Sequence, residues 1–346
     1  GDYRLLSAVN FSGAGGGTFL ITSANFTSPA NFTSSASSSG TIILAANGVV
    51  LSGNVGTSSA LANIAIEAEA NSYTTFRGNI YTTNTAGIKF ADGAILELRG
   101  NTYNVAHIHG DATSGTEGIL RFTNGGNVTL TTTAAAGDDI NTLSIENGTA
   151  LTLFGSQGID FKNLVFTAST GGTPMLTLAS GKALDAYAVK TITSKAGANI
   201  PEVRFSGTNH TIANDVTVGT DANNLVRFRF MDTAVGKTFT VNSTNFYGQI
   251  TTNVNNVGGA VLNALNGKVY GLGEPGKMLN TVEFKADNIT NYGDTYATNT
   301  TITDNFTTIL SGTVAGTVTL GTTKGNTSLN LRDQANLIGN VVAFAG

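Results

Sequence analysis

The sequence predicts an all-β protein built as a right-handed parallel β-helix, and three observations support that prediction. Short stretches of alternating apolar and polar residues occur along the chain, separated by glycine, asparagine, aspartate and serine, whereas amphipathic helical patterns are nearly missing. A unit containing phenylalanine recurs while its sequence drifts, as stacked repeats allow. The 346 residues run on without a break in composition.

Residues 226–230 show the alternation most clearly. Successive side chains of a strand point to opposite faces of the sheet. Val226, Phe228 and Phe230 therefore share one face, and Arg227 and Arg229 share the other. The pattern predicts that the phenylalanines are buried and that the two arginines are exposed to water.

The recurring unit consists of an aliphatic residue, any residue, a phenylalanine and a short polar turn. Successive phenylalanines of this unit are 23 to 56 residues apart. These intervals cluster near about 20 or 40 residues, which corresponds to one or two turns of a solenoid. This spacing predicts a solenoid of about 15 turns, in which phenylalanine recurs at equivalent internal places. The units are Ile88-Lys89-Phe90, Leu120-Arg121-Phe122, Leu164-Val165-Phe166, Val203-Arg204-Phe205, Val226-Arg227-Phe228 and Val282-Glu283-Phe284.

The polar turns leave a second fold open. Pairs such as Asn47-Gly48 and Asn147-Gly148 are typical of β-hairpins, which would favour an antiparallel β-sandwich. The corners of a parallel β-helix also need residues that tolerate positive φ, and asparagine and glycine supply it. The length and the drifting repeat favour the β-helix.

Two regions depart from the pattern. Residues 1–40 hold a local duplication and a serine-rich run, which indicates an N-terminal edge or capping segment before a β-helix over 41–346. Residues 256–278 are rich in glycine and asparagine around an apolar stretch. They predict a short helix and a loop inserted into the solenoid and projecting from it, where binding often resides.

Composition excludes several classes of function. Charged residues make up 12%, about half the usual level, and the net charge is −4, so nothing indicates binding to nucleic acid or an anionic membrane. Cysteine is absent, which removes disulfides and thiolate chemistry. The sequence contains no run of 18 apolar residues, so we expect no direct insertion into a membrane. The chain begins with Gly1, so we expect a processed piece with any targeting segment outside it.

Three phrases resemble a known family: Leu279 to Phe284, Asn163 to Phe166 and Pro201 to Ile212. Together with the strands rich in glycine, asparagine and threonine, they resemble passenger domains of Gram-negative autotransporters (type V secretion). They are most similar to rickettsial surface cell antigens of the outer-membrane-protein-B type. The resemblance covers most of residues 40–346, and it is one of style and repeat rather than of a diagnostic motif.

The resemblance implies a secreted rod on the bacterial surface, exported across the periplasm and outer membrane through a C-terminal translocator barrel outside this chain. Members of that class serve as adhesins, invasins or coat proteins. We therefore expect a non-enzymatic adhesin whose partner is a host cell-surface protein or glycan. A structural coat protein that self-associates is the first alternative, and a polysaccharide-degrading β-helix enzyme is the second.

The stretch Ala106 to Asp111 looks most like a reactive site. His107 and His109 lie on one face of a strand, and with Asp111 or Glu117 they would suit a transition metal. The alternative is a pair of half-exposed outward side chains. No further histidine or cysteine lies nearby, since the other histidine is His210. We therefore predict no metal site and no cofactor.

An enzyme of this fold needs carboxylates clustered on one outer face. The adjacent pair Asp138-Asp139 follows a small-residue run typical of a solvated loop. The other candidates are scattered, so we predict no catalytic residue. They are Asp160, Asp185, Glu202 and Asp215.

The outward arginines suggest one further possibility, a basic stripe for an anionic partner such as a sulfated glycan. Cross-strand pairing and strand solubility are the favoured interpretation. The stripe would contain Arg121, Arg204, Arg227 and Arg229, and we predict a contact face made of His107, His109, Arg204, Arg227 and Arg229.

Overall fold

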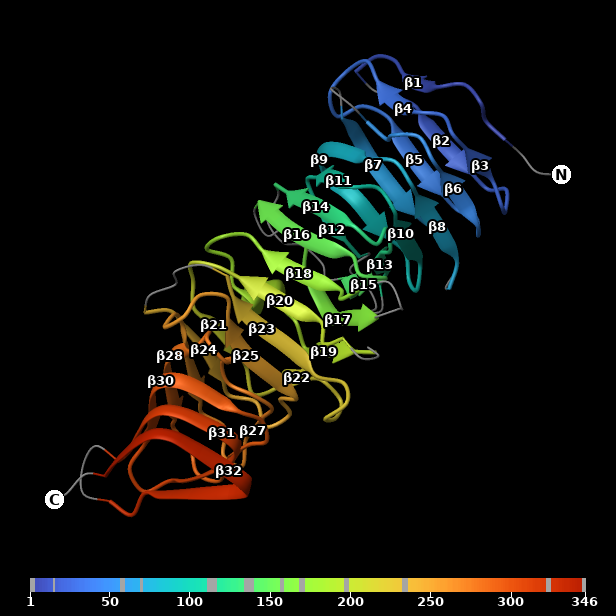
Figure 1. Ribbon diagram of the computed structural model, residues 1–346. Helices are drawn as coiled ribbons and strands as arrows, with labels where there is room; N and C mark the ends of the chain where they lie inside the picture. The colour runs from blue at the N-terminus through green and yellow to red at the C-terminus, as the bar shows by residue number, and fades with distance from the viewer. Residues whose placement is uncertain are drawn as a thin grey trace. The chain divides into compact units, whose positions relative to one another are not determined.

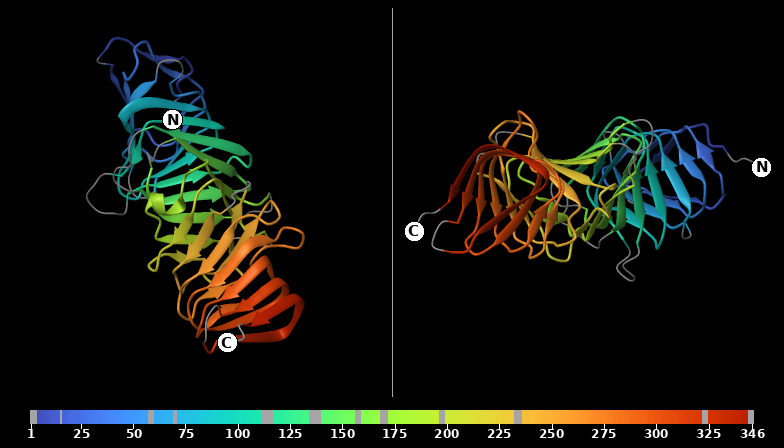
Figure 2. Two further views of the ribbon diagram at one scale, coloured as in Figure 1. Left: turned by 90° about the vertical axis from the view of Figure 1, so that its left-hand side faces the viewer. Right: turned by 60° about the horizontal axis from the view of Figure 1, so that its bottom comes forward.

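A computed structural model describes residues 4–14, 16–56, 60–68, 71–110, 117–133, 140–155, 159–167, 172–195, 199–231, 236–321 and 325–343. The regular secondary structure of this part of the chain is almost entirely β-strand, and the chain divides into two compact units. Unit 1 comprises residues 1–177 and 187–189, and unit 2 comprises residues 178–186 and 190–346. Within each unit the strands stack one above the next as turns of a solenoid (Figures 1 and 2).

Unit 1 contains two main parallel sheets and a short pair. The first sheet has the order β3 (Thr27–Ser28), β6 (Val49–Leu51), β8 (Tyr73–Phe76), β10 (Ile95–Leu98), β13 (Ile119–Phe122), β15 (Ile140–Glu146) and β17 (Phe161–Thr167). The second has β2 (Thr18–Ile21), β5 (Thr41–Leu44), β7 (Leu61–Ile66), β9 (Ile80–Phe90), β11 (Thr102–Val105), β14 (Asn127–Thr132), β16 (Ala150–Gly155) and β18 (Met175–Leu178). In addition, β12 (Ile108–His109) pairs with β9, and β1 (Val9–Phe11) pairs with β4 (Phe32–Ser34).

Unit 2 is built from parallel strands in the same way. Its strands form the series β19 (Thr191–Ser194) and β22 (Thr217–Val218); β20 (Glu202–Phe205), β23 (Val226–Phe230) and β25 (Gly248–Thr252); and β21 (His210–Ile212), β24 (Thr238–Val241), β26 (Gly259–Leu262), β28 (Leu279–Phe284), β30 (Thr295–Ile302) and β31 (Thr307–Leu320). The remaining strands are β27 (Lys268–Val269), β29 (Ile289–Asn291) and β32 (Ser328–Ala343), and η1 (Leu184–Tyr187) is a short 3-10 helix. The prediction of an all-β parallel β-helix is confirmed.

The asparagine-glycine corners explain why the sandwich alternative is wrong. Asn147 and Gly148 both have positive φ, 55° and 72°, as a tight hairpin turn would require. The strands that they join do not pair with each other, however. β15 pairs with β13 and β17, whereas β16 pairs with β14, and all these pairs are parallel. The corner therefore turns the chain from one sheet to the other.

The phenylalanines of the recurring unit form the core. Phe90, Phe122, Phe166, Phe205, Phe228 and Phe284 are all at most 1% exposed. In unit 1 they lie on two sheets, Phe90 on β9 of the second sheet and Phe122 and Phe166 on the first, where Phe122 pairs in register with Leu98 on one side and Ile145 on the other. Aliphatic and aromatic side chains thus alternate along this column of the first sheet, which accounts for the two-turn spacing of Phe122 and Phe166.

Repeated glycine-asparagine pairs mark another corner of unit 1, at 53–54, 78–79 and 100–101. A Cβ on Gly78 would lie 2.3 Å from the carbonyl oxygen of Gly53 in the previous turn, so no larger residue fits. The side chain of Asn54 accepts a 2.9 Å hydrogen bond from the backbone N–H of Asn79. The corner therefore uses glycine for close approach and asparagine to satisfy the backbone of the next turn.

Residues 256–278 do not form the predicted helix and projecting insertion. Gly259–Leu262 is strand β26, which pairs in parallel with β24 and β28, and β27 pairs with β29. A short apolar run does not distinguish a buried strand from a helix by periodicity, and here the sheet partners decide. In residues 1–40, β2 and β3 pair with β5 and β6, and the capping role of this segment stays a prediction.

Unit 2 contains a single histidine, His210, which is buried and only 1% exposed. Its ring lies 4.0 Å from that of Phe205, and its Nδ1 accepts a 3.2 Å hydrogen bond from the backbone N–H of Leu184. Burial lowers its pKa from 6.5 to about 4. The folded protein therefore holds this imidazole neutral at physiological pH.

We expect this histidine to make unit 2 sensitive to acid. Because the unfolded chain binds a proton near pH 6.5 and the folded chain near 4, the free energy of unfolding should fall between those pH values, by about 3 kcal/mol. His210→Asn keeps an acceptor for Leu184 and does not titrate. Urea unfolding at pH 7 and pH 4 should show a larger loss for the wild type than for this variant, and equal losses would contradict the assignment.

Candidate functional site

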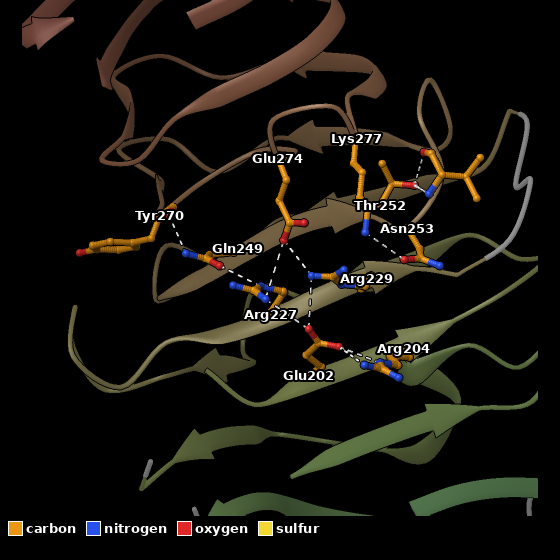
Figure 3. A network of polar contacts seen from close by, with 11 residues as sticks. Glu202, Arg204, Arg227, Arg229, Gln249, Thr252, Asn253, Tyr270, Glu274 and Lys277 are labelled. Atoms are coloured by element: carbon orange, nitrogen blue, oxygen red, sulfur yellow. Dashed lines mark hydrogen bonds and ion pairs between the residues drawn. The ribbon is translucent and has the colours of Figure 1, made fainter. Parts of the chain in front are cut away.

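Three arginines and two glutamates form one ion cluster on the outer face of unit 2, which we call the arginine–glutamate cluster: Glu202, Arg204, Arg227, Arg229 and Glu274. Register places Glu202 beside Arg227 and Arg204 beside Arg229 on strands β20 and β23. Alternation along each strand sends these side chains outward while Val203, Phe205, Phe228 and Phe230 point into the core. Figure 3 shows Glu202 and Glu274 on either side of Arg227 and Arg229.

Glu202 is the centre of the cluster. It accepts a 2.7 Å hydrogen bond from Arg204, and its other oxygen lies 3.2 Å from Arg227 and 3.3 Å from Arg229. Burial acts to raise the pKa of the Glu202 carboxyl. The hydrogen bond from Arg204 and the charges of the three guanidinium groups outweigh burial, so that its pKa lies below the usual 4.5.

Glu274 joins the cluster from a loop and covers Arg229. It accepts a 2.7 Å hydrogen bond from Arg229, although the two residues are 45 positions apart in the chain. The Arg229 side chain is only 11% exposed. The prediction that both arginines of β23 are exposed to water is therefore wrong for Arg229, because a loop from a later turn lies over it.

A groove of about 280 Å³ adjoins the cluster. Its polar lining comes from successive turns of unit 2 and includes Arg227, Gln249, Tyr270, Glu274 and Asp294. Gln249 is held between its neighbours, since its Oε1 accepts a 3.1 Å hydrogen bond from Arg227 and its Nε2 donates to the Tyr270 carbonyl at 3.4 Å. The lining side chains are thus fixed by contacts within the fold (Figure 3).

Three tyrosines stack along the same side of unit 2, and we call them the tyrosine ladder: Tyr247, Tyr270 and Tyr292. Their ring centroids are 5.4 and 5.1 Å apart, with interplanar angles of 24° and 20°. Tyr292 is 50% exposed. Burial, followed by the neighbouring tyrosines and Asp221, raises the pKa of Tyr270, so its hydroxyl stays neutral at physiological pH.

The predicted contact face is divided between the two units. His107 and His109 belong to unit 1, whereas Arg204, Arg227 and Arg229 belong to unit 2. Within unit 2 the structure brings the three arginines together. That these five residues contact a binding partner stays a prediction.

The two histidines of unit 1 are half-exposed outward side chains, which is the alternative to a metal site. His107 and His109 are half-buried, with Ile108 fully buried between them, and their rings stack 4.4 Å apart. The ring nitrogens of His109 lie 2.9 Å and 3.0 Å from the carbonyl oxygens of Gly110 and Ala86. Both nitrogens of His109 are therefore engaged with backbone.

The carboxylate ligands suggested for this pair are Asp111 and Glu117. Asp111 lies outside the described residues, as do Asp138 and Asp139. Among the residues that the structure describes, no group of three or more histidine, aspartate or glutamate side chains is placed to hold a metal ion.

No helix in that same part of the chain is long and apolar enough to cross a membrane.

Ion pairing also accounts for Arg121, the remaining arginine of the suggested stripe. It donates two hydrogen bonds, of 2.9 and 2.8 Å, to the carboxylate of Glu146 one turn away. A third goes to the Tyr73 hydroxyl. In both units the arginines of the suggested stripe therefore form ion pairs with glutamates.

Stacked parallel turns with polar side chains fixed on their outer face define a parallel β-solenoid. In an alignment of 312 residues the chain is 29% identical to outer membrane protein B of Rickettsia typhi, with 82% of this chain and 18% of that protein covered. In an alignment of 152 residues it is 34% identical to outer membrane protein B of Rickettsia japonica, with 40% of this chain and 9% of that protein covered. No protein-family model and no solved structure matches.

The chain is thus homologous to a segment of these outer membrane proteins and spans less than a fifth of their length. This homology and the β-solenoid fit an autotransporter passenger domain at the cell surface, as the sequence resemblance implies. The relatives are named as outer membrane proteins, not as enzymes.

Proposed function

We propose that the chain is part of a secreted surface passenger domain that acts as a non-enzymatic adhesin. The observation that carries the proposal is the groove of unit 2, where aromatic and polar side chains are held in place on the outside of a rigid scaffold. Side chains that are already fixed lose little conformational entropy when a ligand contacts them, and this favours binding. The homology to outer membrane protein B supports a location where such a groove would meet a host surface.

Saturable binding to cells tests the proposal. The chain of residues 1–346, fluorescently labelled, should bind cultured animal cells with a plateau, and excess unlabelled chain should displace it. Protein that has been unfolded by heat serves as the control and should not compete.

The coat-protein alternative predicts a different result. A structural or self-associating protein would show concentration-dependent assembly in sedimentation and no saturable cell binding. That pair of results would contradict the adhesin proposal.

A further inference from the structure

We propose that the groove of unit 2, together with the exposed end of the tyrosine ladder, binds a neutral oligosaccharide. The inference rests on the proposed function, because it names the class of host ligand that the adhesin would take. Three properties of the surface support it: its aromatic faces, its fixed hydrogen-bonding groups and its balance of charge.

The tyrosine ladder supplies an apolar face beside the groove. Sugar rings present C–H groups on one face, and these pack on aromatic rings. Tyr270 lines the groove and stacks on Tyr292, whose ring is half-exposed. Asn291 pairs in register with Leu310, so the residues opposite Tyr292 in the next turn are the small Ser311 and Gly312, which leave that ring uncovered by a larger side chain.

The groove supplies the polar contacts that sugar hydroxyls require. Each hydroxyl both donates and accepts, so a saccharide site needs donors and acceptors close together. Arg227 and Gln249 provide donors, and Glu274 and Asp294 provide acceptors. Asp294 is itself held by a 2.7 Å hydrogen bond from the backbone N–H of Thr313. With a volume of about 280 Å³, the groove suits one or two sugar rings.

The charge of the lining favours a neutral ligand over a sulfated one. Arg227 lies 3.2 Å from Glu202 and 3.7 Å from Glu274, and these glutamates also pair with Arg204 and Arg229. The carboxylate of Asp294 in the groove brings the sum of three arginines and three carboxylates to zero. An anionic glycan would therefore meet no net positive charge from these side chains, and it would lie against the carboxylates of Glu274 and Asp294.

Isothermal titration of the whole chain with neutral trisaccharides of glucose, galactose, mannose and N-acetylglucosamine tests the inference. At least one should bind with a Kd of about 10 mM or tighter, and Tyr292→Ala and Gln249→Ala should each weaken it about tenfold. Tyr292→Phe keeps the ring and should bind like the wild type. The matched control is Tyr73→Ala, an exposed tyrosine of unit 1, which should stay within about twofold.

Four outcomes decide the question. Weaker binding by Tyr292→Ala and Gln249→Ala, with the same melting temperature as the wild type, supports the inference. Binding of none of the four sugars, equal binding by all variants, or tighter binding of a heparin-derived sulfated disaccharide overturns it. If cells still bind the chain saturably while no sugar does, the adhesin proposal stands and only the ligand class is wrong.

Discussion

Replacing Phe239 with alanine should lower the free energy of unfolding by about 3–5 kcal/mol, because it removes the centre of the aromatic core of unit 2. Phe239 is fully buried, and its ring lies 4.8 Å from Phe228, 5.6 Å from Phe205 and 6.3 Å from Phe246. Phe205 comes from the turn before the one that contains Phe228, Phe239 and Phe246, so the cavity would weaken packing both within one turn and between two neighbouring turns. Urea unfolding followed by circular dichroism measures the loss.

The matched control for Phe239 is its neighbour Thr240, whose side chain points outward on the same strand. Thr240→Ala should change the free energy of unfolding by less than about 1 kcal/mol. A loss below about 1 kcal/mol for Phe239→Ala would show that the aromatic cluster does not hold unit 2 together.

Glu202→Gln should destabilise unit 2 by about 3 kcal/mol at neutral pH. The change leaves the buried guanidinium of Arg229 with Glu274 alone, and removing one partner of a buried ion pair is costly. Because the pKa of the Glu202 carboxyl is lowered in the fold, its stabilisation is present above the usual 4.5 and is lost as the pH falls through the folded value. The difference between wild type and variant should therefore narrow in acid.

A surface ion pair of unit 2 provides the control for the arginine–glutamate cluster. Glu283 and Lys285 form a 2.6 Å pair whose side chains are 36% and 48% exposed. Glu283→Gln should cost at most about 1 kcal/mol, since solvent screens this pair. Equal losses for Glu202→Gln and Glu283→Gln would contradict the burial of the cluster.

The core of the fold follows from local sequence. The alternation at 226–230 correctly predicts which side chains of β23 point inward, and the phenylalanine unit correctly predicts that its phenylalanines are buried. The expectation that they recur at equivalent places is wrong, because they lie on three different sheets and Phe228 pairs in register with Val203 rather than with Phe205. The asparagine-glycine corners do not decide between hairpin and solenoid by themselves, since both need positive φ. Only the strand partners, which lie a whole turn away in the chain, make that distinction.

The site is harder to predict because its members come from different turns. Arg229 points outward as alternation requires, but its burial depends on Glu274, 45 residues further along. No local pattern reports such a contact. Residues 256–278 illustrate the same limit, because the apolar run around Gly259 becomes a strand only through its pairing with β24 and β28.

The tyrosine ladder did leave a signal in the sequence. Tyr247, Tyr270 and Tyr292 are 23 and 22 residues apart, close to the length of one turn. Hydrogen-bonded side chains of neighbouring turns lie 19 to 29 positions apart in this chain. A search for surface aromatics at the turn period would therefore have placed the ladder, and with it one side of the groove.

A disulfide cross-link between adjacent turns tests the parallel register on which both the fold and the groove depend. The chain has no cysteine, and Thr240 pairs with Val261 on strands β24 and β26, both side chains pointing outward. Strands about 4.8 Å apart bring such a pair within disulfide range. Thr240→Cys with Val261→Cys should cross-link on mild oxidation, whereas Thr240→Cys with Asn263→Cys should not. Equal cross-linking in both, or cross-linking in the second pair alone, would contradict the parallel β-solenoid.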